Sequence, residues 1–282
     1  MFDRRSKNVE IFNDSMELIR ENSKLQNALT ESLIKQKLYL ENEEIKVCDL
    51  EKKKLKTKVI VSKKRSFDAA SAYAREGKKV CVLNFASATN PGGGVKHGSS
   101  AQEEALCRCS TLYSCLDAKE LWNHFYTPHR KANIPLYNND CIYTPGVVVF
   151  KSDISFPKRM HEVDWYSVDV ITCAAPNLRE CPSNRMNPNA GSHAAKLSTD
   201  ELLKLQEKRI GRIFAIAVQN GVEVMILGAF GCGAFCNPPE VVAKAFANVQ
   251  EKYRGCFETI EYAIYCRDYE EENYYAFCKV VQ

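Results

Sequence analysis

The sequence has no long apolar run, and no segment approaches the roughly 18 consecutive apolar residues that a membrane-spanning helix needs. Its first residues, MFDRRSKNVEIFNDS, are charged and lack the apolar core of a secretion signal. We therefore expect a protein that stays in the compartment where it is made, the cytoplasm, and that does not enter a membrane.

Recognisable metal and disulfide patterns are also missing, although the chain has 13 cysteines. No C-x-x-C occurs, and the nearest approaches are Cys107-x-Cys109 and Cys232-x-x-x-Cys236. Structural zinc sites usually take paired cysteine arms or histidines at matched spacing. We expect buried free thiols in a reducing compartment, no metal and no cofactor.

Two common phosphate-binding motifs are absent as well. No glycine-rich segment fits G-x-x-x-x-G-K-[ST], and none fits G-x-G-x-x-G cleanly. Nucleoside triphosphate hydrolysis and hydride transfer are therefore disfavoured. The net charge of +4 is modest, and its lysine runs at 51–58 and 62–66 indicate a solvated face or a weak preference for a polyanion. We expect no sequence-specific binding of nucleic acid.

The first part of the chain predicts helices. Residues from about 8 to 56 contain no glycine or proline and are rich in Glu, Lys, Leu and Asn. Apolar side chains recur there at spacings of three to five, which indicates a stripe that packs on the main domain rather than a coiled coil. We assign 1–57 to a helical extension of a monomer and 58–282 to the catalytic domain. The stripe comprises Ile11, Met16, Ile19, Leu25, Leu29 and Leu33.

From residue 58 onward, short β-rich runs alternate with amphipathic helices, which is typical of an α/β fold. Three helices are predicted at 66–77, 199–219 and 238–253, with Ser66 and Asn237 as expected N-caps. The second helix opens with Ser198-Thr199-Asp200-Glu201. Strands are expected at 58–62, 79–86, 146–151, 168–175, 222–230 and 260–266.

The most informative segment, 84–110, is a buried strand followed by three consecutive glycines and an acid-bearing helix. Glycines allow the backbone a positive φ and a close approach to a ligand, with N–H groups directed at an anion. A flexible surface turn is the alternative. The segment 226–239 repeats the design with Gly228, Gly231 and Gly233. Phe230 is assigned to the core, and Phe235 is a candidate contact for a base or sugar.

Two glycine loops at the carboxyl ends of strands in one sheet define a crevice for a nucleotide-like ligand. The helix after the first loop begins with Gln102, Glu103 and Glu104. Ser100 and Glu103 have capping-box spacing, so Glu103 is expected to bond back to the Ser100 amide. Glu104 has no such role and is assigned to the crevice, with a solvated surface position as the alternative.

These residues carry a resemblance. GGG at 92–94, seven residues, and QEE at 102–104 together resemble the signature of the microbial-type poly(ADP-ribose) glycohydrolases. The likeness extends over roughly 58–282 through the segments VLNFASATNPGGG, IYTPGVVVFKSD, VITCAAPNLR, LGAFGCGAFCNPP and AIYCRDYEEENYYAFCKVV. It implies a macrodomain-like three-layer α/β/α fold with a mixed central sheet.

The resemblance also implies roles for individual residues. Glu104 corresponds to the catalytic glutamate, and Glu103 to the acid that positions a sugar hydroxyl. The first loop lies beside the scissile ribose and diphosphate, Phe235 lies near the distal ribose, and Asn90 contacts a ribose hydroxyl. The substrate-binding set implied in this way comprises Asn84, Asn90, Gly92, Gly93, Gly94, Gln102, Gly228, Gly231, Cys232, Gly233, Ala234 and Phe235.

The activity implied is hydrolysis of the ribose–ribose O-glycosidic bond in poly(ADP-ribose), with release of ADP-ribose from chain ends. The partners would then be poly(ADP-ribose) or ADP-ribosylated proteins as substrate. Three alternatives remain at this point: an enzyme for protein-linked mono-ADP-ribose, a module that binds ADP-ribose without cleaving it, and a scaffold that self-associates through its N-terminal helix.

Overall fold

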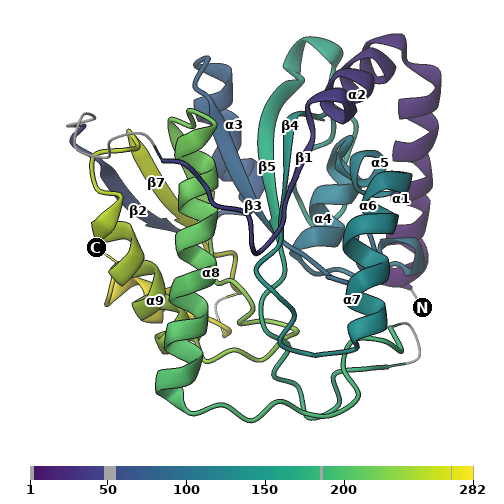
Figure 1. Cartoon of the computed structure of the whole chain (residues 1–282). Coiled ribbons are helices and arrows are strands. Elements are labelled where there is room, and N and C mark those ends of the chain that lie inside the picture. The colour runs from purple at the N-terminus through teal and green to yellow at the C-terminus, as the bar shows by residue number, and fades with distance from the viewer. Residues whose placement is uncertain (1–2, 48–54, 185–186, 268, 282) are drawn as a thin grey trace.

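The computed structural model describes residues 3–47, 55–184, 187–267 and 269–281. The strands that it describes form one seven-stranded mixed sheet in the order β1-β4-β5-β3-β6-β7-β2 (Figure 1). Their bounds are β1 (Lys37–Tyr39), β2 (Lys58–Ser62), β3 (Val80–Phe85), β4 (Cys141–Val149), β5 (Tyr166–Cys173), β6 (Val224–Leu227) and β7 (Thr259–Ala263).

Five neighbouring strands are parallel, from β5 through β3, β6 and β7 to β2, whereas β4 is antiparallel to β5 and β1 is antiparallel to β4. The carboxyl ends of parallel strands meet at one edge of a sheet. Both glycine loops leave from that edge, because one follows β3 and the other follows β6. The topology therefore brings together two segments that are more than a hundred residues apart.

Helices cover both faces of the sheet, because successive strand residues point to opposite sides. In β3, Val80 and Val82 pack into a core with α3 and α4, whereas Cys81 and Leu83 pack into a core with α8 and α9. The predicted α/β/α layers with a mixed central sheet are confirmed. The helices of the two outer layers are α3 (Ser66–Arg75), α4 (Gln102–Cys109), α5 (Leu112–Leu116), α8 (Thr199–Gln219), α9 (Pro239–Lys252) and α10 (Glu272–Cys278).

Short helical segments fill the connections. They are η2 (Val95–His97), α6 (Lys119–Leu121), η3 (Trp122–Tyr126), α7 (Thr127–Ala132) and η4 (Glu162–Asp164). None of the described helices is long and apolar enough to cross a membrane. No disulfide joins the cysteines in the described part of the chain.

The N-terminal part forms α1 (Arg4–Glu21) and α2 (Ser23–Lys35), which lie beside the sheet in Figure 1. Ile19 and Leu25 are buried against Phe150, as the apolar stripe predicts, but Leu33 is 39% exposed. The prediction of helix up to residue 56 is wrong for residues 36–47 and 55–56, none of which is helical. Residues 37–39 instead pair with β4, whose open edge supplies a hydrogen-bonding partner that local sequence does not reveal. Residues 48–54, which include part of the first lysine run, lie outside the described residues.

Two of the predicted helix caps are wrong. The N-caps of α3 and α9 are Arg65 and Pro238, and neither makes a side-chain capping bond. The side chains of Ser66 and Asn237 bond elsewhere: Ser66 accepts from Gln102, and Asn237 donates to the Gly231 carbonyl. These two side chains therefore bond to residues outside the first turn of their helices instead of capping them. The start of α8 is different, because Ser198 and Glu201 form a complete capping box.

Candidate active site

Gln102 fixes the start of α4 against the end of β3. Its Oε1 accepts from the Phe85 amide at 2.9 Å, and its Nε2 donates to the Leu83 carbonyl at 2.8 Å. The side-chain amide is therefore bonded to the strand backbone at both ends. This clamp places the first turn of α4, with its two glutamates, at the carboxyl edge of the sheet.

Glu103 does not form the predicted capping box. The N-cap of α4 is Ala101, which has no side-chain capping bond, and the Glu103 carboxylate turns into the loop after β3. Its Oε2 accepts from the Ser87 amide at 2.8 Å, and its Oε1 accepts from Asn84 Nδ2 at 3.3 Å. Burial raises the pKa of Glu103 well above its usual range, and the neighbouring Glu104 carboxyl raises it further. The capping prediction failed because these donors, distant in sequence from Ser100, engage both carboxylate oxygens.

Glu104 points into the protein and is only 7% exposed. Its Oε1 accepts from the Gly94 amide at 2.9 Å, whereas its Oε2 has no hydrogen-bond partner among the described residues. Burial raises the pKa of Glu104 above its usual range, although the bond from Gly94 opposes that shift. A buried carboxyl with one unoccupied oxygen is suited to holding a proton and delivering it to a ligand.

The first glycine loop supports Glu104 through its own backbone. Gly93 has a φ of +56°, and its amide donates to the Asn90 carbonyl at 3.0 Å. The next amide, that of Gly94, donates to Glu104. These two N–H groups are therefore used within the protein and do not face an anion, contrary to the expectation from sequence. Asn90 is also engaged, because its side-chain oxygen accepts from the Arg130 guanidinium.

The second glycine loop contains backbone amides that are free to donate hydrogen bonds to a ligand. Within the described part of the chain, the amides of Gly231, Gly233, Ala234 and Phe235 donate no hydrogen bond. Gly231 has a φ of +82°, and a Cβ at this position would lie 2.6 Å from the Ala175 Cβ. Only glycine fits there, so the close contact with the segment that follows β5 depends on it. A run of unengaged amides in one loop is suited to binding an anion.

The other members of the second loop have different surroundings. Gly228 is required where β6 ends, because a Cβ there would lie 2.9 Å from the Ala263 carbonyl oxygen. The Cys232 amide is engaged, since it donates to the Ala229 carbonyl. Phe230 is fully buried, as predicted from sequence. Phe235 is only partly buried, with Arg179 above its ring at 5.8 Å.

One cavity joins the two loops, and we call it the first cavity. It has a volume of about 340 Å³ and is lined by Gly93, both glutamates and, from the second loop, Gly231, Gly233, Ala234 and Phe235. Its remaining wall includes Phe85, Ile264 and Tyr265, which provide apolar and aromatic surface. This volume falls in the range of small-molecule sites, which run from roughly 300 to 1,000 Å³. The structure thus brings the two loops and Glu104 to one crevice.

Sequence reasoning missed several residues of this wall. Tyr265 and Asn273 follow β7, and Arg65 follows β2, at the same edge of the sheet as the glycine loops. Their position was predictable in principle, because the segments that follow parallel strands gather at that edge of the sheet. Ser87, which donates its amide to Glu103, follows β3 directly and carries no such signal in its residue type. The described residues contain no group of histidine, cysteine and acidic side chains that could hold a metal ion.

Comparison with known proteins agrees with this geometry. A family model described as the microbial-type PARG catalytic domain matches residues 7–152, which is more than half of the 282-residue chain. The match begins in α1, so the N-terminal helices lie within the family's own domain. No curated protein sequence matches the chain.

Solved structures with the same fold cover nearly the whole chain. Poly(ADP-ribose) glycohydrolase from Thermomonospora curvata, bound to the inhibitor ADP-HPD, superposes with a TM-score of 0.82 and is 27% identical, with 98% of this chain and 99% of that chain covered. The enzyme from Deinococcus radiodurans, in complex with ADP-ribose, gives a TM-score of 0.72 at 27% identity, with 89% and 95% covered.

Proposed function

The chain belongs to the microbial-type poly(ADP-ribose) glycohydrolase family, and we propose that it hydrolyses the ribose–ribose O-glycosidic bond of poly(ADP-ribose), releasing ADP-ribose from chain ends. One observation carries this proposal. The buried Glu104 carboxyl lies between two glycine loops and keeps Oε2 without a partner among the described residues. A reader module that only binds ADP-ribose would have no use for such an acid.

The first cavity would hold the ADP-ribose unit that is released. Its diphosphate binds the unengaged amides of Gly231, Gly233, Ala234 and Phe235. Its adenosine extends along the apolar wall formed by Phe85 and Tyr265. The ribose at the other end then lies between Phe235 and the two glutamates, with its reacting carbon beside Glu104.

The hydrogen bonds favour Glu104 over Glu103 as the proton donor. Both oxygens of Glu103 accept from N–H groups, so a proton on either oxygen would displace one of these donors. Glu104 Oε2 can carry a proton without losing any bond. Burial raises the pKa of both carboxyls, and that of Glu103 more strongly, and two adjacent buried carboxyls are not both charged at low cost. We assign the proton to Glu104 because the two N–H donors on Glu103 stabilise its ionised form, whereas Oε2 of Glu104 has no donor among the described residues.

In the reaction, Glu104 donates its proton to the oxygen of the departing ribose, and the bond between that oxygen and the anomeric carbon breaks. The bound diphosphate stabilises the oxocarbenium-like state that follows. The Glu104 carboxylate then takes a proton from water, whose oxygen bonds to the anomeric carbon. The products are ADP-ribose and a chain shortened by one unit, and Glu104 is again protonated.

The family resemblance implies that Glu103 positions a ribose hydroxyl, and its placement at the cavity wall supports this role. Its second role is to hold the loop after β3 through the Ser87 amide. We further propose a monomer that acts in the cytoplasm, with polymer or ADP-ribosylated protein as substrate, and without sequence-specific binding of nucleic acid.

A product assay tests the function. Incubation with labelled poly(ADP-ribose) should yield ADP-ribose from the first time points while long chains persist, since chain ends are cut. Oligomers of intermediate length would mean internal cleavage. Polymer that survives prolonged incubation would identify a binding module instead. Faster release of ADP-ribose from a mono-modified protein than from polymer would identify the other hydrolase.

A further inference from the structure

A second cavity adjoins the first at the reacting group. It has a volume of about 630 Å³ and shares Gly93, Glu104 and Phe235 with the first cavity. The rest of its wall includes the start of α1, residues of the segment 94–101, Arg179, and the aromatic residues Tyr113 and Trp122. Glu104 therefore lines both spaces.

Basic side chains are concentrated in this second cavity. Arg4, Arg5, Lys96 and Arg179 line it, and Glu104 is its one acidic side chain among the described residues. Lys96 is also paired with Asp117, at 3.8 Å. Arg4 and Arg5 are exposed and form no ion pair within the described part of the chain. Unpaired guanidinium groups around a concave surface attract anions, phosphates above all.

The start of α1 is held in place beside the first glycine loop. Asn8 donates from Nδ2 to the Gly98 carbonyl at 3.0 Å. Gly98 has a φ of +74°, and a Cβ there would lie 2.3 Å from the Arg5 carbonyl oxygen. The backbone of α1 thus packs directly on the segment that carries Lys96, so the basic wall is assembled from two parts of the sequence.

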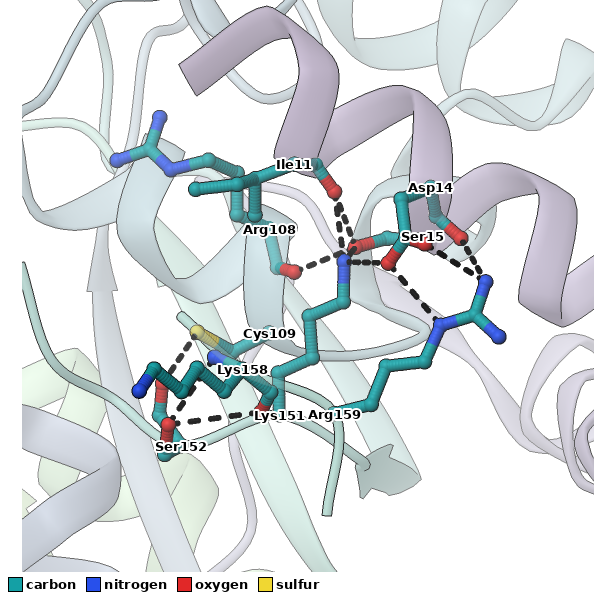
Figure 2. A network of polar contacts seen from close by, with 9 residues as sticks. All are labelled: Ile11, Asp14, Ser15, Arg108, Cys109, Lys151, Ser152, Lys158 and Arg159. Carbon is teal, nitrogen blue, oxygen red and sulfur yellow. Dashed lines mark hydrogen bonds and ion pairs between the residues drawn. The ribbon is translucent and has the colours of Figure 1, made fainter. Parts of the chain in front are cut away.

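A buried network fixes the remainder of α1, as Figure 2 shows. The Lys151 side chain is 1% exposed, and its Nζ donates to the Ile11 carbonyl at 2.7 Å and to Ser15 Oγ at 2.6 Å. It also pairs with Asp14 at 2.6 Å. Ser15 in turn donates to the Arg108 carbonyl in α4 at 2.7 Å. The helix that supplies Arg4 and Arg5 is therefore anchored to the helix that supplies Glu104.

We propose that the second cavity is the subsite for the departing part of the polymer, and that Arg4 and Arg5 bind the diphosphate of the neighbouring ADP-ribose unit. This inference rests on the proposed function. The bond to be cut must lie at Glu104, and the released ADP-ribose occupies the first cavity. Whatever is attached through the leaving oxygen then enters the adjoining second cavity, which Glu104 also lines and where the basic side chains are.

The positive charge of the second cavity favours a ligand that carries phosphate groups. The next unit of the polymer brings two phosphate charges, which match the unpaired arginines. A chain-end enzyme gains affinity for polymer over free ADP-ribose in this way, without any contact to the released unit.

Calorimetry on an inactive background tests the proposal. In Glu104→Gln, a dimer of ADP-ribose should bind more tightly than ADP-ribose itself. Adding Arg4→Ser and Arg5→Ser should weaken dimer binding on the order of tenfold, as expected for the loss of two exposed charge contacts. The Kd of ADP-ribose should not change. In the active enzyme, the same two substitutions should raise the KM for the dimer, and its dependence on salt should become weaker.

The control replaces two other basic residues, Arg20→Ser and Lys35→Ser. These residues are exposed, lie outside the second cavity and give the same change in net charge. The control should leave both Kd values unchanged. Unaltered dimer binding after loss of Arg4 and Arg5 would overturn the subsite, as would an equal loss for ADP-ribose. Failure of Glu104→Gln to bind ADP-ribose at all would instead overturn the proposed function.

Discussion

A Cβ atom on Gly93 would lie 2.6 Å from Oε1 of Glu104. The backbone of the first glycine loop therefore touches the carboxyl group directly, and the neighbouring Gly94 amide holds the same oxygen at 2.9 Å. The glycines of this loop fix the position of an acid.

Gly93→Ala should disable the enzyme. The methyl group would displace Glu104, and the φ of +56° would also become strained. Because misplacing a reacting group by about 1 Å can cost about a hundredfold in rate, turnover of poly(ADP-ribose) should fall by that order. The measurement is the initial rate of ADP-ribose release.

Gly211→Ala is the matched control for this change. Gly211 lies inside α8, and a Cβ atom there would have no neighbour within 4 Å, so the methyl group fits. Its turnover should equal that of the parent, and the free energy of unfolding should rise by up to about 1 kcal/mol, since alanine favours helix. Equal rates for the Gly93 and Gly211 variants would disprove the contact argument.

Glu104→Gln should separate binding from catalysis. The amide keeps the size of the side chain but cannot deliver a proton, so turnover should fall by about 10²–10⁴ or more. Calorimetric affinity for ADP-ribose should be retained, because the amides proposed to bind the diphosphate lie in the second loop. Near-normal turnover would remove Glu104 from the mechanism.

Activity should decline as the pH rises through the pKa of Glu104. Burial raises that pKa above its ordinary value near 4.5, and the reaction needs the protonated acid. The profile of kcat/KM against pH should therefore show an alkaline limb that begins above 4.5. A limb centred at or below 4.5 would contradict this.

The raised pKa of Glu104 also makes the free energy of unfolding depend on pH. A raised pKa means that the folded protein binds the proton more tightly than the unfolded chain does. This contribution is complete below pH 4.5 and is lost as the pH rises through the folded-state pKa. Glu104→Gln does not titrate, so its stability relative to the parent should increase over that pH range, as measured by urea unfolding.

Asp14→Ala should destabilise the anchor of α1. It leaves the buried Lys151 ammonium with only two neutral acceptors, at a cost of about 1.5–3 kcal/mol in the free energy of unfolding. Adding Lys151→Met should recover part of this loss, because an apolar side chain of similar length removes the unpaired charge. Urea unfolding of the single and double variants measures both effects.

Arg159→Ala provides the comparison for this network. Arg159 pairs with the same Asp14 carboxylate at 2.7 Å but is 47% exposed. Exposed ion pairs contribute about 0–1 kcal/mol, so the loss should be much smaller than for Asp14→Ala. A loss as large as that of Asp14→Ala would mean that Lys151 is not the partner that matters.

The residue pattern alone predicted much of the sheet and several helices. The strand at 58–62 and the helix at 199–219 have the predicted bounds. Both were predictable from local signals: a short β-rich run marks the strand, and the capping-box residues Ser198 and Glu201 mark the start of the helix. The residue pattern also identified the two glycine loops and the pair of glutamates, Glu103 and Glu104. The short strand β1 was not, since its residues become a strand only by pairing with β4.

The sequence by itself determined which residues are available: two glycine-rich turns after strands, and a pair of glutamates at a helix start. Only the tertiary structure decided what they do. It turned Glu103 toward Ser87 and Asn84, and it engaged the Gly93 and Gly94 amides within the protein. It left four amides of the second loop without a hydrogen bond to the described part of the chain, and it placed the start of α1 at the cavity that Glu104 lines. The physical reason is that each of these outcomes depends on a hydrogen bond or contact between segments that are distant in sequence. Such a bond competes with local hydrogen bonds, and the sequence of one segment alone does not show which of the two forms.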